Sequence, residues 1–261
     1  MKIIGTSMKI SKSKLFKIIT ESMLEEGVYD PGILKAVFMA GGPGSGKSRL
    51  AADLFYLPRG ELSSFSPLGL KILNSDPAFE MFLKKMGVDP KKLSELSPEE
   101  FADLTLPTDS PRQKARALRD KAAEHYMSSR LGLIIDGTGE NYEKVEKKRA
   151  ILNSLGYDTY MVFVNTDLDV ALERNSKRSR VLPEELVERA WRRVRRNMGK
   201  FQDLFEPDKF RIIDNTYYDP IPEKIHKAVM RFVNEPVMNP IGKEWIRDQM
   251  SHRNMEKNSE N

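Results

Sequence analysis

Short apolar runs alternate with amphipathic stretches along most of the chain. Five such runs predict buried strands, at residues 33–39, 71–74, 131–135, 159–164 and 210–213. Between them apolar residues recur at helical spacing, as at Leu50 and Leu54. Strands that alternate with helices predict a three-layer α/β fold, in which about five parallel strands are covered by helices on both faces. Ligands of such sheets bind at the carboxyl ends of the strands.

The same pattern divides the chain into one domain with extensions. We expect the domain at residues 33–233, with a helical insertion at 77–127, where two Ser-Pro pairs give helix-start signals. Residues 1–32 are expected to form a basic helical extension. Residues 234–261 form a polar tail that we expect to be partly disordered.

The charge distribution adds basic regions to this picture. The 261 residues carry a net charge of +5. Residues 1–20 hold five lysines and no acid, and residues 174–200 hold ten Lys or Arg against three Glu. Such regions indicate either a polyanionic partner or a solvated basic face.

The absence of cysteine excludes disulfides, thiolate metal sites and cysteine nucleophiles, and it fits a reducing compartment. Lysines interrupt the apolar residues near the N-terminus, and no apolar run reaches membrane-spanning length. We therefore expect a cytoplasmic protein without a membrane partner.

The stretch "GGPGSGKS", residues 41–48, matches the pattern G-x-x-x-x-G-K-[ST] between a predicted strand and a predicted helix. Glycines let backbone N–H groups point inward beside the helix N-terminus, which makes a nest for phosphates. We expect Lys47 to reach the β and γ phosphates of ATP and the Ser48 hydroxyl to bind Mg²⁺. The alternative is a glycine-rich turn without function. The predicted nucleotide-binding residues are Gly42, Pro43, Gly44, Ser45, Gly46, Lys47, Ser48 and Arg49.

Two aspartates follow predicted strands and therefore lie at the same edge of the sheet. Asp136 ends the third strand, where it suits a contact to Mg²⁺ or caps a helix. Asp76 follows the second strand, where it is placed to accept the proton of a hydroxyl that attacks the γ-phosphorus, or to act as an N-cap before Pro77. Gly137 stands where mechanical ATPases carry the glutamate that polarises water, which argues against a motor.

A basic lid is predicted at residues 174–183, within the stretch "ERNSKRSRVLP", because four cations fall within seven residues at a helix end. Guanidinium groups there are expected to fold over the triphosphate, unless the stretch is solvated surface. The next helix has an apolar stripe for the core and a basic flank, which is either a phosphate track or a charged face. This flank consists of Arg189, Arg192, Arg193, Arg196 and Lys200.

The order "GGPGSGKS", "LNSD", "LIIDGT" and "ERNSKRSRVLP" resembles the P-loop kinases grouped with bacteriophage polynucleotide kinase and the zeta toxins. The resemblance covers about residues 33–215, and the closest local match is "RNSKR", which looks like the lid of the phage polynucleotide kinase. It implies a five-stranded parallel sheet, ATP with Mg²⁺, Asp76 as the general base, and Arg174 and Arg178 as lid arginines. It also implies a bacteriophage-encoded protein that acts in the host cytoplasm.

Phe79 departs from this family pattern, because both relatives usually carry an arginine three residues after the catalytic aspartate. We expect the ring to stack on a base or sugar rather than to hold a terminal phosphate. The leading hypothesis is an ATP-dependent phosphotransferase whose acceptor hydroxyl lies on a nucleic acid, at a 5′ end or a hydroxylated base, or on a nucleotide. The alternatives are a zeta-toxin-like kinase of a nucleotide-sugar and a nucleotide-hydrolysing switch or assembly factor.

Overall fold

The computed structural model describes residues 28–30, 32–57, 66–217 and 220–259. The predicted α/β fold is confirmed, because five parallel strands form one sheet in the order β2-β3-β1-β4-β5. The strands are β1 (Lys35–Ala40), β2 (Lys71–Leu73), β3 (Leu133–Asp136), β4 (Asp158–Asn165) and β5 (Phe210–Asp214). The glycine-rich loop follows the central strand β1, so it lies at the carboxyl ends of the strands, in the middle of the sheet.

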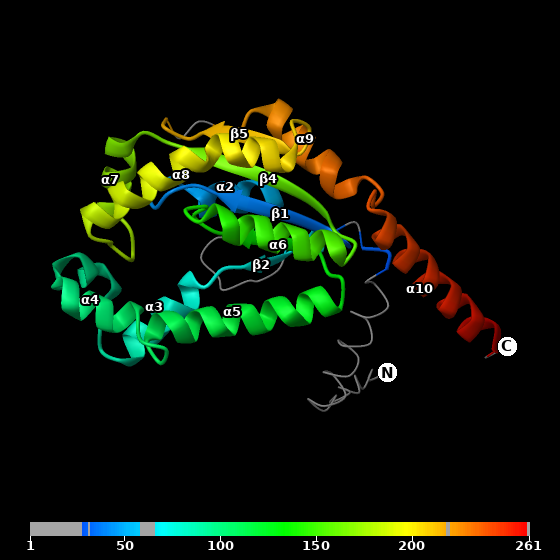
Figure 1. Cartoon of the computed structure of the whole chain (residues 1–261), viewed down its shortest axis with the longest axis horizontal. Helices are drawn as coiled ribbons and strands as arrows, with labels where there is room; N and C mark the ends of the chain where they lie inside the picture. Colours follow the sequence, from blue (N-terminus) through cyan, green and yellow to red (C-terminus); the bar gives the residue numbers. More distant parts are fainter. Residues whose placement is uncertain (1–27, 31, 58–65, 218–219, 260–261) are drawn as a thin grey trace, which may run out of the picture.

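Helices cover both faces of this sheet (Figure 1). They are α2 (Lys47–Phe55), α3 (Asp76–Lys85), α4 (Pro98–Thr105), α5 (Pro111–Ser128), α6 (Tyr142–Ser154), α7 (Leu168–Ser176), α8 (Glu184–Phe205), α9 (Glu223–Asn234) and α10 (Pro240–Ser259), with a 3₁₀ helix η1 (Pro90–Glu95). Successive strand residues point to opposite faces. Phe38 therefore packs in a core with α5, α6 and α8, whereas Val37 and Met39 pack in a second core with α2 and α9.

Residues between β2 and β3 add a small helical unit beside the sheet edge. Ser97 and Ser110 start α4 and α5 by accepting hydrogen bonds from backbone N–H groups three residues later. Phe79 and Leu83 from α3 pack with residues of η1, α4 and α5 in a third apolar cluster. In Figure 1 this unit lies opposite α7 and the start of α8, with the carboxyl ends of the strands between them.

The C-terminal segment differs from the expected partly disordered tail, because residues 240–259 form the helix α10. The backbone N–H groups of Met238 and Asn239 donate to the Asp158 carboxylate, which fixes the start of the segment. Trp245 and Ile246 then pack against the core next to the sheet. These contacts offset the conformational entropy that the segment loses on becoming ordered. Its polar composition alone gives no such compensation.

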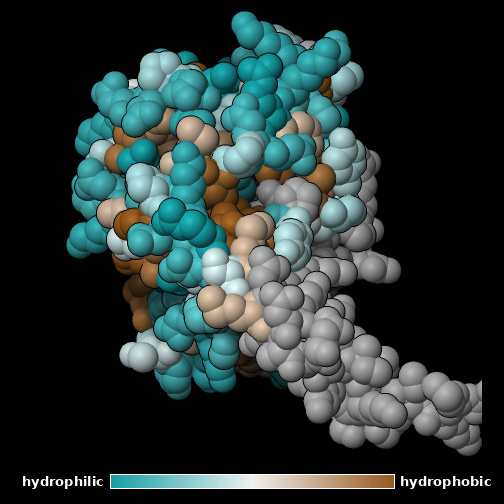
Figure 2. All heavy atoms as spheres, turned by 90° about the vertical axis from the view of Figure 1, so that its right-hand side faces the viewer, coloured by the Kyte–Doolittle hydropathy of each residue, from teal (hydrophilic) through white to brown (hydrophobic). Residues whose placement is uncertain are grey.

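Figure 2 views the end of the molecule where α10 lies and shows mainly hydrophilic side chains around a smaller hydrophobic area. None of the helices that the structure describes is both long and apolar enough to cross a membrane. The predicted helix near the N-terminus falls in residues 1–27, which are outside the described residues.

Candidate active site

The phosphate-binding loop fills the turn between β1 and α2. Gly44 and Gly46 have φ angles of +77° and +85°, which L side chains rarely adopt. A Cβ at Gly44 would lie 2.1 Å from the Ala171 carbonyl oxygen, and one at Gly46 would lie 2.3 Å from the Asn215 amide nitrogen. Glycine is therefore required here by conformation and by the close approach of α7 and of the segment after β5.

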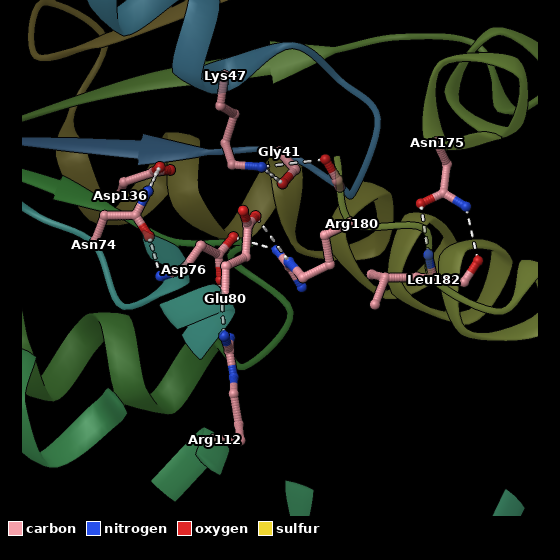
Figure 3. Close-up of polar contacts among 11 residues, drawn as sticks. Gly41, Lys47, Asn74, Asp76, Glu80, Arg112, Asp136, Asn175, Arg180 and Leu182 are labelled. Atoms are coloured by element: carbon pink, nitrogen blue, oxygen red, sulfur yellow. Dashed lines mark hydrogen bonds and ion pairs between the residues drawn. The ribbon is translucent and has the colours of Figure 1, made fainter. Parts of the chain in front are cut away.

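Lys47 points from the start of α2 back over the loop (Figure 3). Its Nζ donates hydrogen bonds to the carbonyl oxygens of Gly41 and Gly42, the second at 3.1 Å. Burial lowers the pKa of Lys47, while the nearby Asp136 acts in the opposite direction. The ammonium is thus held at the point where strand ends and loop meet.

A cavity of about 580 Å³ lies between the loop and the predicted lid. From the loop side it is lined by Gly42, Gly44, Gly46, Lys47, Ser48 and Arg49, all predicted as nucleotide-binding residues. Pro43 and Ser45, also predicted, are buried and do not line it. From the lid side Arg174, Lys177 and Arg178 line it. The arrangement suits a polyphosphate, because loop N–H groups and cations face the same space.

Asp136 ends β3 directly beside β1, with Met39 as its register partner. Its Oδ2 accepts a hydrogen bond of 2.9 Å from the Asn74 amide, and its Oδ1 is buried without a hydrogen-bond partner. Burial raises the pKa of Asp136 to about 6. Asp136 does not cap a helix, since Asn141 is the N-cap of α6. An unsatisfied buried carboxylate oxygen fits a ligand for a hard cation such as Mg²⁺.

Asp76 is the first residue of α3, and its N-cap is Ser75, so the capping alternative is wrong for the Asp76 side chain. The Asp76 carboxylate accepts a hydrogen bond of 2.7 Å from Arg112 and a second, short one from Arg180. Asn74 connects the two aspartates, because its Oδ1 accepts from the Asp76 backbone N–H while its Nδ2 donates to Asp136 (Figure 3).

The two arginines set the protonation state of Asp76. Burial acts to raise the pKa of Asp76, but the charges of Arg180 and Arg112 outweigh it and hold this pKa below its ordinary value. The carboxylate is therefore ionised across the neutral range. Arg180 also lies 3.7 Å from Glu80, one turn further along α3.

The two predicted lid arginines have different surroundings. Arg174 is buried, and its guanidinium donates to the carbonyl oxygens of Asn215 and Thr216 at 2.7 and 3.0 Å. It thereby ties α7 to the segment after β5 while it lines the cavity. Arg178 also lines the cavity, and its charge acts on Lys47, Asp136 and Asp76. Of the two predicted catalytic arginines, Arg178 is thus the one whose charge acts on Lys47, Asp136 and Asp76 together.

The predicted lid contacts the helical insertion. The Asn175 amide both donates to the Leu182 carbonyl and accepts from its N–H, which pins the loop between them (Figure 3). The Val181 N–H donates to the Pro90 carbonyl at 3.2 Å. Arg180, only 7% exposed, crosses from this loop to Asp76.

Phe79 contradicts the expectation that it stacks on an acceptor base. Its side chain is only 2% exposed, within the third apolar cluster. The guanidinium groups of Arg112 and Arg180 lie 5.2 and 5.8 Å from the ring centroid. The ring therefore supports these cations through cation–π contact rather than receiving a base.

Sequence reasoning missed Arg112 and Asn74 and passed over Arg180. Arg180 was within the predicted lid, but nothing in the local pattern separated it from its neighbours. Arg112 is 36 residues from Asp76 along the chain. The sequence predicts a helix there, but no local signal shows that this helix packs beside Asp76. The only hint was the missing arginine at position 79, since a cation absent from one element can be supplied by another.

Fold and site together define a P-loop protein with a kinase-like fold. A family model described as an AAA domain matches residues 37–201, more than half of the chain, and the chain belongs to this family. No curated protein matches the sequence.

Several solved structures are similar in fold. The PezAT chromosomal toxin-antitoxin system of Streptococcus pneumoniae shows 15% identity over 95% of this chain and 98% of that chain, with a TM-score of 0.48. Shikimate kinase from Acinetobacter baumannii shows 17% over 79% and 96%, with a TM-score of 0.38. Deoxyadenosine kinase from M. mycoides with bound dATP shows 19% over 77% and 100%, with a TM-score of 0.36.

Proposed function

We propose that this protein is an ATP-dependent phosphotransferase that moves the γ-phosphate of ATP to a hydroxyl group. The observation that carries the proposal is the ionised carboxylate of Asp76, held by two arginines and linked through Asn74 to Asp136 at the edge of the phosphate-binding loop. A carboxylate in this position orients an acceptor hydroxyl toward the γ-phosphorus. Gly137 supplies no carboxylate for water activation.

The nucleotide phosphates bind against the loop N–H groups and Lys47. Lys47 then exchanges its bonds to the Gly41 and Gly42 carbonyls for bonds to the β and γ phosphates. Arg178 faces the same cavity and neutralises the charge that spreads over the transferring phosphoryl group. Arg174, fixed by two carbonyl groups, positions the lid from which Arg178 projects.

Ser48 and Asp136 are the residues that would hold Mg²⁺, because one hydroxyl and one buried, unsatisfied carboxylate oxygen suit an ion that keeps several waters and phosphate oxygens. An ion held there would supply positive charge against the phosphate oxygens of the nucleotide. A cation also favours the ionised form of Asp136, against the burial that raises its pKa.

Asp76 acts on the acceptor rather than on the nucleotide. Its lowered pKa makes it a weak base. A weak base suffices, because the transition state of phosphoryl transfer is loose and the attacking hydroxyl keeps its proton until late. Asp76 therefore accepts a hydrogen bond from the hydroxyl, directs the oxygen at phosphorus, and takes the proton as the new P–O bond forms. The bond between the γ-phosphorus and the oxygen of the β phosphate breaks, and ADP leaves with that oxygen.

The acceptor hydroxyl belongs to a nucleic acid or a nucleotide in this proposal. Arg112 and Arg180 beside Asp76 support an anionic acceptor, since each guanidinium presents more donors than the carboxylate uses. A hydroxyl group at the end of a nucleic-acid strand, on a modified base or on a nucleotide belongs to such an anionic acceptor. A nucleotide-sugar would be such an acceptor too and is an outcome of the test below.

The test incubates the protein with γ-labelled ATP, Mg²⁺ and a panel of 5′-hydroxyl DNA and RNA, hydroxymethylated DNA, nucleosides, nucleotides and UDP-sugars. Label on an acceptor, lost in Lys47→Ala and retained in the surface control Lys114→Ala, supports the proposal. Rapid release of phosphate without any labelled acceptor would instead identify a nucleotide-hydrolysing switch.

A further inference from the structure

A row of arginines runs along α5 away from Asp76. Arg112, Arg116 and Arg119 follow one another at spacings of four and three residues, so they share one side of the helix. Burial lowers the pKa of Arg116, and the charges of Arg112 and Arg119 lower it further. The charges of Arg112 and Arg119 thus both act on Arg116, which lies between them on the helix, while Asp120 acts in the opposite direction.

Lys148 on α6 adds a fourth cation. Burial lowers the pKa of Lys148, and the charge of Arg119 lowers it further, while Asp120 acts in the opposite direction. Ala123 of α5 and Leu152 of α6 belong to the same core, so the two helices cover the same face of the sheet. Lys148 thus faces the far end of the row. We call Arg112, Arg116, Arg119 and Lys148 the α5 basic row.

Carboxylates within the described part of the chain balance this row incompletely. Arg112 pairs with Asp76, and Arg119 pairs with its neighbour Asp120. Arg116 has a long contact of 3.5 Å to the Gln113 amide oxygen, and no described carboxylate lies within 4.0 Å of Arg116 or Lys148. Repulsion between like charges destabilises the helix unless an anion lies between them.

The row has a direction as well as a charge. Arg112 points at Asp76 (Figure 3), where the acceptor hydroxyl is proposed to lie. From Arg112 to Arg119 the helix rises by about 10 Å, at 1.5 Å per residue. A single phosphate next to the hydroxyl would need only the first arginine. A line of cations of this length fits a chain of phosphates instead.

We propose that the α5 basic row binds the phosphodiester backbone of a single-stranded nucleic acid whose terminal hydroxyl lies at Asp76. This inference rests on the proposed function, because it assigns the acceptor class to the same site. Successive phosphates of the strand contact Arg116 and then Arg119 and Lys148, while Arg112 bridges the first phosphate and Asp76. The basic flank of α8, in which Arg192 is already paired with Glu188, is then a charged surface rather than the acceptor track.

The test measures binding of a fluorescent six-nucleotide strand with a 5′-hydroxyl, without ATP, over a series of salt concentrations. Each phosphate contact to a single strand contributes about 0.7 to the slope of log K against log salt. Arg116→Gln and Arg119→Gln are each expected to lower this slope by about 0.7. Lys114→Gln and Lys121→Gln remove the same charge from the other side of α5 and are expected to leave the slope unchanged, as is Arg193→Gln on α8.

The length of the nucleic-acid ligand gives a second readout. Affinity is expected to be lower for a nucleoside 3′-phosphate and for a dinucleotide, which each carry one phosphate, than for the six-nucleotide strand, which carries about five, and Arg116→Gln should reduce this difference. Equal effects of the row variants and the Lys114, Lys121 and Arg193 variants, or equal affinity for all three ligands, would overturn the inference.

Phosphate transfer is scored separately. Labelled strands made equally well by wild type and by the Arg116→Gln, Arg119→Gln double variant would reject the row while leaving the proposed function intact. Row-dependent binding without transfer of label would reject the proposed function and retain the row as a strand-binding site.

Discussion

Replacement of Arg112 by methionine tests whether the pair of arginines controls Asp76. The change removes a guanidinium whose Nη1 lies 2.7 Å from Asp76 Oδ1 and leaves Arg180 in place. Methionine keeps an unbranched side chain over the Phe79 ring, so packing in the third apolar cluster is largely retained. The expected result is a higher pKa for Asp76.

The size of this change follows from the distance and the exposure. Two unit charges 4 Å apart interact by about 4 kcal/mol at an effective dielectric constant of 20. Asp76 is 32% exposed, so solvent screens part of this interaction. A neighbouring arginine typically lowers the pKa of an aspartate by about 1 to 3 units. We expect the lower end of that range, about one unit, because Arg180 remains.

The carboxyl ¹³C resonance of Asp76, assigned by its loss in Asp76→Asn, gives this pKa directly. In wild type the two arginines hold the pKa of Asp76 below its ordinary value, and in Arg112→Met this pKa is expected to be higher. The acid limb of kcat/KM should move upward by the same amount, since the free enzyme needs ionised Asp76. Lys114→Met is the matched control. An unchanged Asp76 titration in a folded Arg112→Met protein would refute the electrostatic role given to Arg112.

Three further replacements test the other groups of the site. Asp76→Asn should keep ATP affinity and slow the chemical step by about 10² to 10⁴, the usual contribution of a positioned base, in single-turnover assays; loss of ATP affinity at an unchanged rate would assign Asp76 to the nucleotide site. Arg178→Ala should lower turnover about 10² to 10³-fold with a smaller effect on ATP affinity measured by titration. The pKa of Asp136 is raised from 3.8 to about 6, so the folded state loses stability as pH rises through this window and does not regain it above. Asp136→Asn should therefore raise the free energy of unfolding at pH 8 by up to about 3 kcal/mol in urea titrations without Mg²⁺, and have no such effect at pH 3.

The sheet and the phosphate-binding loop were predictable because their determinants are local. Apolar runs of strand length recur between helical stretches, and the glycines required at positions 44 and 46 lie in one contiguous motif. Asp76 and Asp136 could be placed at one edge because parallel strands end together. Their bridge through Asn74 was not predictable, since it depends on side-chain direction at the ends of β2 and β3.

The remaining contacts depend on how distant elements pack. Arg112 reaches Asp76 only because α3 and α5 share the cluster around Phe79 and Leu83. Likewise α10 is ordered by Asp158 and by the core beside the sheet, although its own residues are mainly polar. Local composition carries no information about either partner, so sequence reasoning left Arg112 unnoticed and predicted a partly disordered tail where α10 lies.

The arginines of the predicted lid are close in sequence but have different partners, and the sequence alone does not show which partner each one has. Arg174 lies in the last turn of α7, which ends at Ser176, and its buried guanidinium donates to carbonyl groups after β5. After the end of α7, the two hydrogen bonds between the Asn175 side chain and the Leu182 backbone fold the chain back toward the insertion. Arg178 therefore lines the cavity beside the phosphate-binding loop, and Arg180, two residues later, reaches Asp76. Because one short loop carries both arginines, its position sets the geometry of the proposed nucleotide site and of the proposed acceptor site together.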